Sequence, residues 1–355
     1  MARIELVNVA HSYDGGKEYA LKPLNMVWED GCTYALLGPS GCGKTTMLNI
    51  ISGLLKPSEG RLLFDGVDVT DSNTAGRNIA QVFQFPVIYS TMTVAQNLAF
   101  PLVCRGYPDH EIRRRVDNVA GLLGLSDKMQ MPARRLTADL KQLVSMGRGL
   151  VREDVSAILL DEPLTVIDPQ MKFELRRKLK QINREFGITM VFVTHDQNEA
   201  MTFAEEVVVM KDGEIMQRGS PQDLFERPDN TFVGYFIGSP PMNFLDARLE
   251  GGTLVCEGLG YHAPVQGVPA GARMQLGFRP EFVVLDGNGA DIRTRARVEH
   301  VDNLGVEAVI TLSLSDGQIV RAKQQGRFRA IAGENLGLGV RAENLQIYCN
   351  GQRLG

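Results

Sequence analysis

One stretch decides the fold class: Tyr34-Ala35-Leu36-Leu37-Gly38-Pro39-Ser40-Gly41-Cys42-Gly43-Lys44-Thr45. From Gly38 onward it fits G-x-x-x-x-G-K-[ST] at every constrained position. The apolar residues before Gly38 predict a strand, and Thr46-Met47-Leu48-Asn49-Ile50-Ile51 predicts a helix after the loop. This strand, loop and helix context argues against a glycine-rich turn that matches by chance, and it predicts a phosphate-binding loop.

Each part of this loop has an expected task in holding a nucleotide. The glycines let backbone N–H groups turn inward around phosphate oxygens. Lys44 is expected to neutralise the β and γ oxygens, and Thr45 to present its hydroxyl to Mg²⁺. Cys42 is expected to contribute only its backbone N–H, with a thiol that is exposed to alkylation. The predicted nucleotide-binding residues of the loop are Gly38, Pro39, Ser40, Gly41, Cys42, Gly43, Lys44, Thr45 and Thr46.

Two further apolar runs end in polar residues. Ala157-Ile158-Leu159-Leu160 is followed by Asp161 and Glu162, which places two carboxylates at the carboxyl edge of a sheet. There Asp161 can hold Mg²⁺ through water, and Glu162 can orient or deprotonate the attacking water. The strand Met190-Val191-Phe192-Val193 leads to His195, which can reach a γ-phosphate. Taken alone, an acidic pair is often a solvated turn, and a lone histidine is more often structural.

Composition limits what the chain can be. With 355 residues, 44% of them hydrophobic and 23% charged, it has globular composition and room for two domains. The net charge of −4 offers no positive field for a nucleic acid. Its five cysteines are scattered singly, as in a reduced cytosolic protein. The amino-terminal residues do not resemble a secretory signal, and no apolar run reaches the length of a spanning helix, so a membrane role is expected to need a partner.

The sequence pattern of the chain changes near residue 236. Residues 1–235 alternate apolar strands with helical patterns, which predicts an α/β domain with a mainly parallel sheet. A helical subdomain is expected within this domain at about 88–150, where Arg113, Arg114 and Arg115 are expected on a solvated helix face. Residues 236–355 contain short alternating segments between glycine-rich turns, which predicts a small all-β barrel domain.

Together these residues resemble the ABC ATPases over almost the whole chain. The resemblance implies ATP and Mg²⁺ as cofactors and a catalytic role for Glu162 and His195, the latter as the switch histidine. It identifies Gln84 with the glutamine of the Q-loop, which reaches toward Mg²⁺ and the attacking water. It also places Tyr13 under the adenine ring and Asp168 in the D-loop, which crosses the dimer toward the other subunit.

Within that family the chain is similar to the maltose-type importers of carbohydrates and polyols. The similarity lies in Thr194–Met201, Phe236–Phe244 and Gly277–Glu281. It implies a tail of the oligonucleotide-binding (OB, TOBE) type that regulates the ATPase without binding nucleic acid. It also implies permease subunits in the membrane, an extracytoplasmic substrate-binding protein, and a peripheral position on the cytoplasmic face of the cell membrane.

The chain departs from the family at the signature motif. Where the family has Leu-Ser-Gly-Gly-Gln, this sequence has Leu136 followed by Thr137, Ala138, Asp139 and Leu140. The family's motif clamps the γ-phosphate of the nucleotide held by the opposite subunit. A carboxylate at Asp139 weakens such a clamp by repulsion. Because a homodimer would have two weakened sites, we expect a heterodimer whose partner carries an intact signature; the alternative is that Asp139 turns away from the nucleotide.

Other functions remain open at this level. An apolar segment, Phe85-Pro86-Val87-Ile88-Tyr89, follows the Q-loop and is expected to contact a permease helix. Together with the altered signature, this segment resembles the paired ATPases of glycerol or polyol importers.

One alternative function is that of an ATP-binding regulatory subunit with little hydrolysis, against which Glu162 and His195 argue. Another is a soluble ABC protein of DNA repair or translation, which would need a coiled coil, zinc hooks or tandem ATPase domains. An exporter is disfavoured by the β tail.

Overall fold

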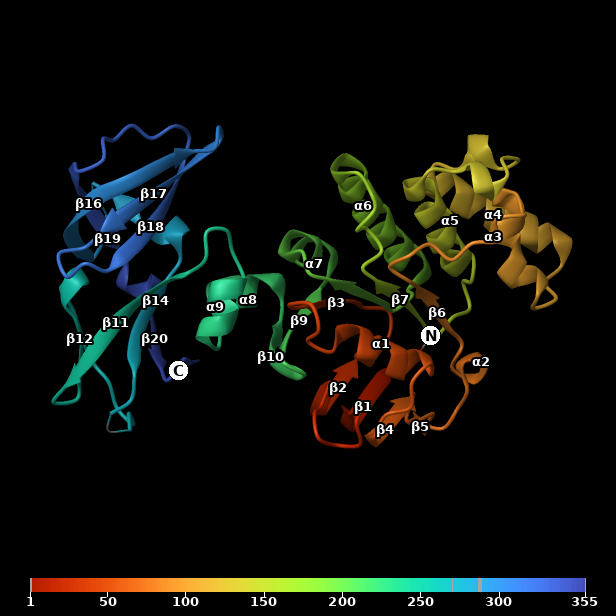
Figure 1. Cartoon of the computed structure of the whole chain (residues 1–355), viewed down its shortest axis with the longest axis horizontal. Coiled ribbons are helices and arrows are strands. Elements are labelled where there is room, and N and C mark those ends of the chain that lie inside the picture. The colour runs from red at the N-terminus through yellow and green to blue at the C-terminus, as the bar shows by residue number, and fades with distance from the viewer. Residues whose placement is uncertain (1, 270, 287–288, 355) are drawn as a thin grey trace. The chain divides into compact units, whose positions relative to one another are not determined.

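The chain divides into two units, Met1–Pro221 and Gln222–Gly355. The computed structural model describes residues 2–269, 271–286 and 289–354 (Figure 1). Each unit has its own hydrophobic core. Within these described ranges, no helix is long and apolar enough to cross a membrane.

A six-stranded sheet organises the first unit. Its strand order is β10-β9-β3-β8-β7-β6, and all neighbours are parallel except the β9–β10 pair. Every residue of β3, β7 and β8 is buried, as expected for strands covered on both faces. The strands are β3 (Thr33–Leu37), β6 (Ile79–Val82), β7 (Ala157–Asp161), β8 (Met190–Thr194), β9 (Glu206–Lys211) and β10 (Glu214–Gly219). The ends of β3, β6, β7 and β8 therefore meet at one edge of the sheet.

An antiparallel sheet and helix α1 complete the core of this unit. The strand order is β2-β1-β4-β5, with β1 (Ile4–His11), β2 (Leu21–Trp28), β4 (Glu59–Phe64) and β5 (Val67–Asp68). Helix α1 (Lys44–Ser52) joins the two sheets, because its Met47 and Ile50 share one core with Leu6 of β1 and Leu36 of β3. The short helix α2 (Thr74–Arg77) precedes β6, and α6 (Pro169–Phe186) and α7 (Gln197–Phe203) follow β7 and β8.

Three helices form a separate group on one side of the first unit (Figure 1). They are α3 (Val94–Val103), α4 (Asp109–Leu123) and α5 (Ala138–Leu150), with single 3-10 turns at Ser126–Lys128 and Ala133–Arg135. A capping box formed by Thr93 and Gln96 starts α3. These helices fall inside the range 88–150 where the sequence predicts a helical subdomain.

One expectation for this helical group is wrong. Arg115 does not share a solvated face with its neighbours, because it is buried. Its guanidinium pairs with Glu111 and Glu153 and lies 4.6 Å from the centre of the Tyr107 ring. Arg113 and Arg114 are exposed as expected.

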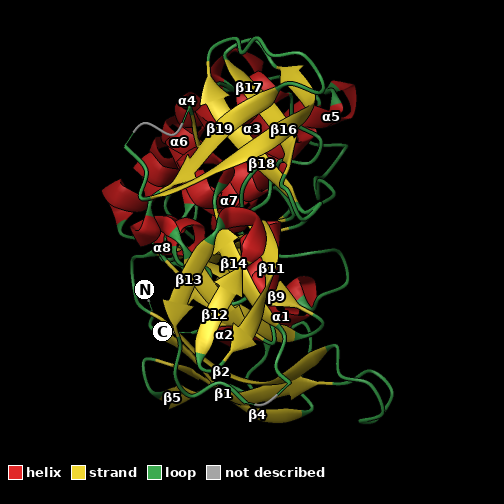
Figure 2. Cartoon of the chain, turned by 90° about the vertical axis from the view of Figure 1, so that its left-hand side faces the viewer, coloured by secondary structure: helices red, strands yellow, loops and turns green. Residues whose placement is uncertain are grey.

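The second unit carries two sheets that appear one above the other in both views (Figure 2). One has the order β13-β12-β11-β14-β20-β21, and the other β15-β19-β16-β17-β18. Side chains of both sheets share one core, which includes Leu245, Leu276, Val298 and Ile310. The strands are β11 (Asn243–Glu250), β12 (Thr253–Cys256), β13 (Tyr261–Pro264), β14 (Met274–Phe278), β15 (Val284–Leu285), β16 (Ile292–Asn303), β17 (Glu307–Ser313), β18 (Ile319–Gln325), β19 (Asn335–Val340), β20 (Gln346–Cys349) and β21 (Gln352–Arg353). The predicted fold class, an α/β domain followed by an all-β domain, is confirmed.

The second unit begins before the boundary expected at residue 236. Its first elements are helices α8 (Pro221–Glu226) and α9 (Thr231–Phe236). The buried guanidinium of Arg279 explains this, because it donates to backbone carbonyls of both helices: Phe225 at 2.7 Å, Gly234 at 3.0 Å, and Ile237 just after α9. Burial lowers the pKa of Arg279 to about 10.

Candidate nucleotide site

The phosphate-binding loop follows β3 directly and leads into α1. A methyl group at Gly38 would lie 2.3 Å from the carbonyl oxygen of Met210, so only glycine permits this approach. Gly43 has φ of 99° and would place a methyl group 2.5 Å from the carbonyl oxygen of Ala20. The shape of the loop is therefore restricted by close contacts with the backbone of Met210 in β9 and of Ala20 just before β2.

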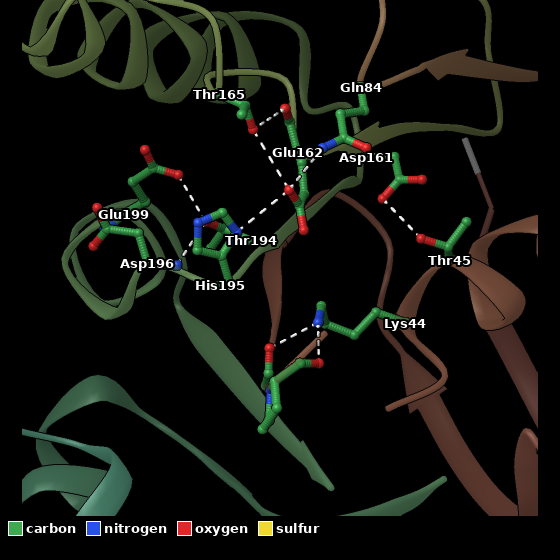
Figure 3. A network of polar contacts seen from close by, with 12 residues as sticks. Lys44, Thr45, Gln84, Asp161, Glu162, Thr165, Thr194, His195, Asp196 and Glu199 are labelled. Carbon is green, nitrogen blue, oxygen red and sulfur yellow. Dashed lines mark hydrogen bonds and ion pairs between the residues drawn. The ribbon is translucent and has the colours of Figure 1, made fainter. Parts of the chain in front are cut away.

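The side chains of Lys44 and Cys42 are buried within this loop. The Lys44 ammonium donates to the carbonyls of Gly38 at 2.7 Å and Pro39 at 2.8 Å (Figure 3). The expectation of an exposed Cys42 thiol is wrong, because Cys42 is 3% exposed and its Sγ lies 3.7 Å from Lys44 Nζ. Burial also raises the pKa of the Cys42 thiol, which disfavours the reactive thiolate.

Thr45 and Asp161 meet across the sheet edge. The Thr45 hydroxyl donates to Asp161 Oδ1 at 3.3 Å. Burial raises the pKa of Asp161, since the low-dielectric surroundings penalise its charged form. No cluster of three or more His, Cys, Asp or Glu side chains suited to a metal occurs in the described ranges. A hydroxyl, one carboxylate and the amide of Gln84 nevertheless fit Mg²⁺, which binds few protein ligands beside substrate phosphates.

Glu162 is the centre of the polar network in Figure 3. Its Oε2 accepts from Gln84 Nε2 at 3.1 Å and from Thr165 Oγ1 at 3.5 Å. The Nδ1 atom of His195 lies 3.3 Å from the same oxygen. Glu162 also has a backbone φ of 44°, in the left-handed region that costs a non-glycine residue free energy. Three side chains, those of Gln84, Thr165 and His195, thus converge on one carboxylate oxygen of Glu162.

Tyr13 lies at the other end of the same depression. A cavity of about 460 Å³ is lined by Tyr13, Ala20, Ser40, Gly41, Gly43, Lys44, Thr45, Thr46, Gln84 and Glu162. The Tyr13 ring is 67% exposed, and its hydroxyl lies 3.2 Å from Thr46 Oγ1. An exposed aromatic ring beside a phosphate-binding loop can stack on a purine base.

The residues of the altered signature lie elsewhere. Among the described residues that line the cavity, none comes from Thr137–Leu140. Thr137 is the N-cap of α5, and Asp139 lies in the first turn of that helix. Asp168 is the N-cap of α6, where its carboxylate accepts from Gln170 N at 2.9 Å. The site within one subunit therefore contains the loop, Gln84, Asp161, Glu162 and His195, but not the signature.

Sequence reasoning missed four residues of this region. Thr165 donates to Glu162, and Thr194 donates to Glu199 beside His195 (Figure 3). Lys172 donates to the other carboxylate oxygen of Glu199. A threonine at the end of a strand and a glutamate in an amphipathic helix carry no pattern that marks them. Only the packing of α7 on β8 and α6 brings them together.

Comparison with known proteins places this geometry in a family. The ABC transporter profile matches residues 21–165, the MalK OB fold domain profile residues 238–283, and the TOBE domain profile residues 276–347. The trehalose/maltose import ATP-binding protein MalK of Thermococcus litoralis is 39% identical over 88% of this chain and 88% of its own length. The chain belongs to the ATP-binding subunits of ABC transporters.

Two further likenesses support the assignment of this ABC subunit. The sn-glycerol-3-phosphate import ATP-binding protein UgpC of Chromohalobacter salexigens is 36% identical and covers 98% of this chain and 94% of its own length. The solved ATP-binding cassette MJ0796, a dimer in a post-hydrolysis state with ADP and Pi, is 31% identical with a TM-score of 0.56. It covers 61% of this subunit and 98% of the cassette. The subunit is an ABC-type ATPase, and its second unit is an OB-like, TOBE-containing all-β domain.

Proposed function

We propose that this subunit hydrolyses ATP to drive a membrane importer of a carbohydrate or polyol, with glycerol and its phosphate esters within that class. The observation that carries the proposal is the convergence of Gln84, Thr165 and His195 on Oε2 of Glu162. A purely regulatory nucleotide-binding subunit has no need of a carboxylate held in a strained backbone conformation by three neighbours. Relatives named as importers of maltose and glycerol phosphate support the substrate class.

The geometry suggests a division of tasks in the reaction. Lys44 exchanges its contacts with the Gly38 and Pro39 carbonyls for the β and γ oxygens of ATP. Glu162 orients the attacking water and takes its proton, and His195 approaches the γ-phosphate from the neighbouring strand. Thr45, Asp161 and Gln84 would hold Mg²⁺, which neutralises charge on the phosphate chain when bound.

We propose that the working assembly contains a second, non-identical ABC subunit. The nucleotide site described above lacks a signature from its own chain, and the dimeric cassette MJ0796 supports assembly in pairs. Asp139 opens α5 where the family has glycine, so a carboxylate would face the partner's triphosphate. An intact signature on the partner would complete the site of Lys44, Glu162 and His195, while the other site would turn over slowly.

The permease is proposed to dock beside the Q-loop. A groove of about 220 Å³ there is lined by Phe83, Val87, Pro101, Arg148 and neighbouring residues. Phe85 is 74% exposed and Val87 52% exposed, so exposed apolar side chains lie on the segment beside the groove, which is also lined by Gln81, Ser145 and Arg152. A short amphipathic helix of a permease fits such a surface. We propose that the docked subunit lies peripherally on the cytoplasmic face of the membrane, and that an extracytoplasmic binding protein supplies the substrate from the opposite side.

The partner proposal is tested by the composition of the native complex. The transporter is extracted in mild detergent through an affinity tag on this subunit, and the stoichiometry of its ATPases is measured by intact mass spectrometry. We expect one copy of this subunit and one copy of a different ABC ATPase whose signature reads Leu-Ser-Gly-Gly-Gln. Two copies of this subunit with no second ATPase would contradict the heterodimer.

A further inference from the structure

Two buried polar side chains, Thr194 and Glu199, and the partly exposed Lys172 lie beside the turn that carries His195. Glu199 of α7 is 5% exposed, and its two carboxylate oxygens are used separately. Its Oε2 accepts from the Thr194 hydroxyl at 2.7 Å (Figure 3). Its Oε1 accepts from Lys172 Nζ of α6 at 3.1 Å. A buried carboxylate that is fully paired in this way is costly to disturb.

Thr194, the residue before His195, bonds to residues that follow His195. While its hydroxyl donates to Glu199, the same oxygen accepts from the backbone N–H of Asp196 at 3.0 Å. Asp196 in turn caps α7, accepting from Asn198 N at 2.8 Å. The residues before and after His195 are therefore bonded to each other and to α7.

His195 lies between Thr194 and Asp196 in this turn. Its side chain is 56% exposed, and its Nδ1 lies 3.3 Å from Oε2 of Glu162. We infer that Glu199, held by Lys172 and acting through Thr194, is the positioning residue that directs His195 toward the reacting phosphate. This inference rests on the proposed role of His195 in the hydrolytic site.

Lys172 also connects Glu199 to the start of α6. It lies in the first turn of α6, and its backbone N–H donates to the carbonyl of Asp168 at 2.9 Å. Asp168 caps that helix. One ion pair therefore links the start of α6 to Glu199, whose other carboxylate oxygen accepts from the Thr194 hydroxyl just before His195.

The test compares variants of Thr194 within the assembled transporter. Thr194→Val keeps the volume and removes both hydroxyl bonds, whereas Thr194→Ser keeps them. We expect Thr194→Val and Glu199→Leu each to lower kcat about tenfold or more with little change in KM for ATP, since the phosphate loop is untouched. Thr194→Ser is expected to restore turnover, and the double variant to lose no more than either single one.

Thr202→Val is the control, because Thr202 lies in α7 beside Glu199 and its hydroxyl donates only to backbone carbonyls of that helix. It should leave kcat unchanged. Lys172→Met should lower kcat and Lys172→Arg should retain it. Equal loss in Thr194→Ser and Thr194→Val, or wild-type kcat in Thr194→Val, would overturn the inference.

A readout without turnover separates this inference from the proposed function. The ¹³Cε1 ring signal of His195 in the full-length chain, assigned by its absence in His195→Ala, should move in Thr194→Val and not in Thr194→Ser or Thr202→Val. If that signal moves while His195→Ala retains wild-type turnover, the positioning stands and the proposed hydrolytic site fails. A signal that stays in place in Thr194→Val rejects the positioning.

Discussion

The Nδ1 atom of His195 lies 3.3 Å from Oε2 of Glu162. The contact follows from strand register, because Asp161 at the end of β7 lies opposite Val193 near the end of β8. Parallel strands in that register release their next residues at the same edge of the sheet. A carboxylate and an imidazole are thereby brought into contact from two segments that have no local sequence relation.

Asp161→Asn is expected to raise the free energy of unfolding at neutral pH and to abolish ATP turnover. Burial raises the folded-state pKa of Asp161 above its ordinary value of 3.8. The folded chain then holds more protons than the unfolded chain in that range, so stability falls as pH rises from 3.8 toward the folded value. Because asparagine does not titrate, the variant should not lose stability as the pH rises through this range. Urea unfolding between about pH 4 and about pH 8 measures the difference; a variant less stable than wild type at neutral pH would contradict it.

Gly43→Ala is expected to destabilise the first unit more than Gly41→Ala. Both glycines have positive φ, 99° and 81°, so both variants share the cost of that backbone conformation. Only at Gly43 does the new methyl group clash, with the carbonyl of Ala20, whereas Gly41 has open space. The clash should add about 1–3 kcal/mol. Denaturant unfolding of both variants checks this, and equal losses would show that the loop absorbs the clash.

Arg77→Met is expected to destabilise the first unit by about 2–4 kcal/mol, because it leaves several buried carbonyls without a donor. Arg77 is 2% exposed. Its guanidinium donates to the carbonyls of Ile50, Ile51, Thr70 and Ser72. Two of these carbonyls lie in the last turn of α1, so the helix behind the phosphate loop loses its anchor. The exposed Arg113 provides the control: Arg113→Met should change stability by less than about 0.5 kcal/mol, and a similar loss in both variants would reject this account.

Asp139→Gly is expected to raise turnover at the site whose nucleotide the partner holds. The change removes a carboxylate that repels phosphate oxygens and restores a residue that permits close backbone approach. The partner's own catalytic glutamate is kept intact for this measurement. Glu162→Gln in this subunit removes turnover at the first site, so that the remaining turnover comes from the site that holds the partner's nucleotide. Unchanged turnover at both sites would mean that Asp139 faces away from the nucleotide.

The sequence predicts those parts of the site that depend on local pattern. The loop from Gly38 to Thr45, the buried strands and the acidic pair after β7 all carry such a pattern. Burial of Cys42 does not, because it depends on the approach of Gly38 to Met210 in a distant strand. Likewise Arg115 reads as part of a charged helix face until Tyr107 and Glu153 are seen beside it. The early start of the second unit rests on Arg279, whose carbonyl partners lie more than forty residues away in the chain.

The central claim is that the working hydrolytic site is the one built on Lys44, Glu162 and His195 of this subunit. It is tested most directly by ATP turnover of the reconstituted transporter carrying Glu162→Gln in this chain, compared with the equivalent change in the co-purified ATPase. We predict a near-total loss of turnover from the change in this chain and a much smaller loss from the change in the partner. Little or no loss from Glu162→Gln would contradict the account and would identify this subunit as one that mainly binds ATP.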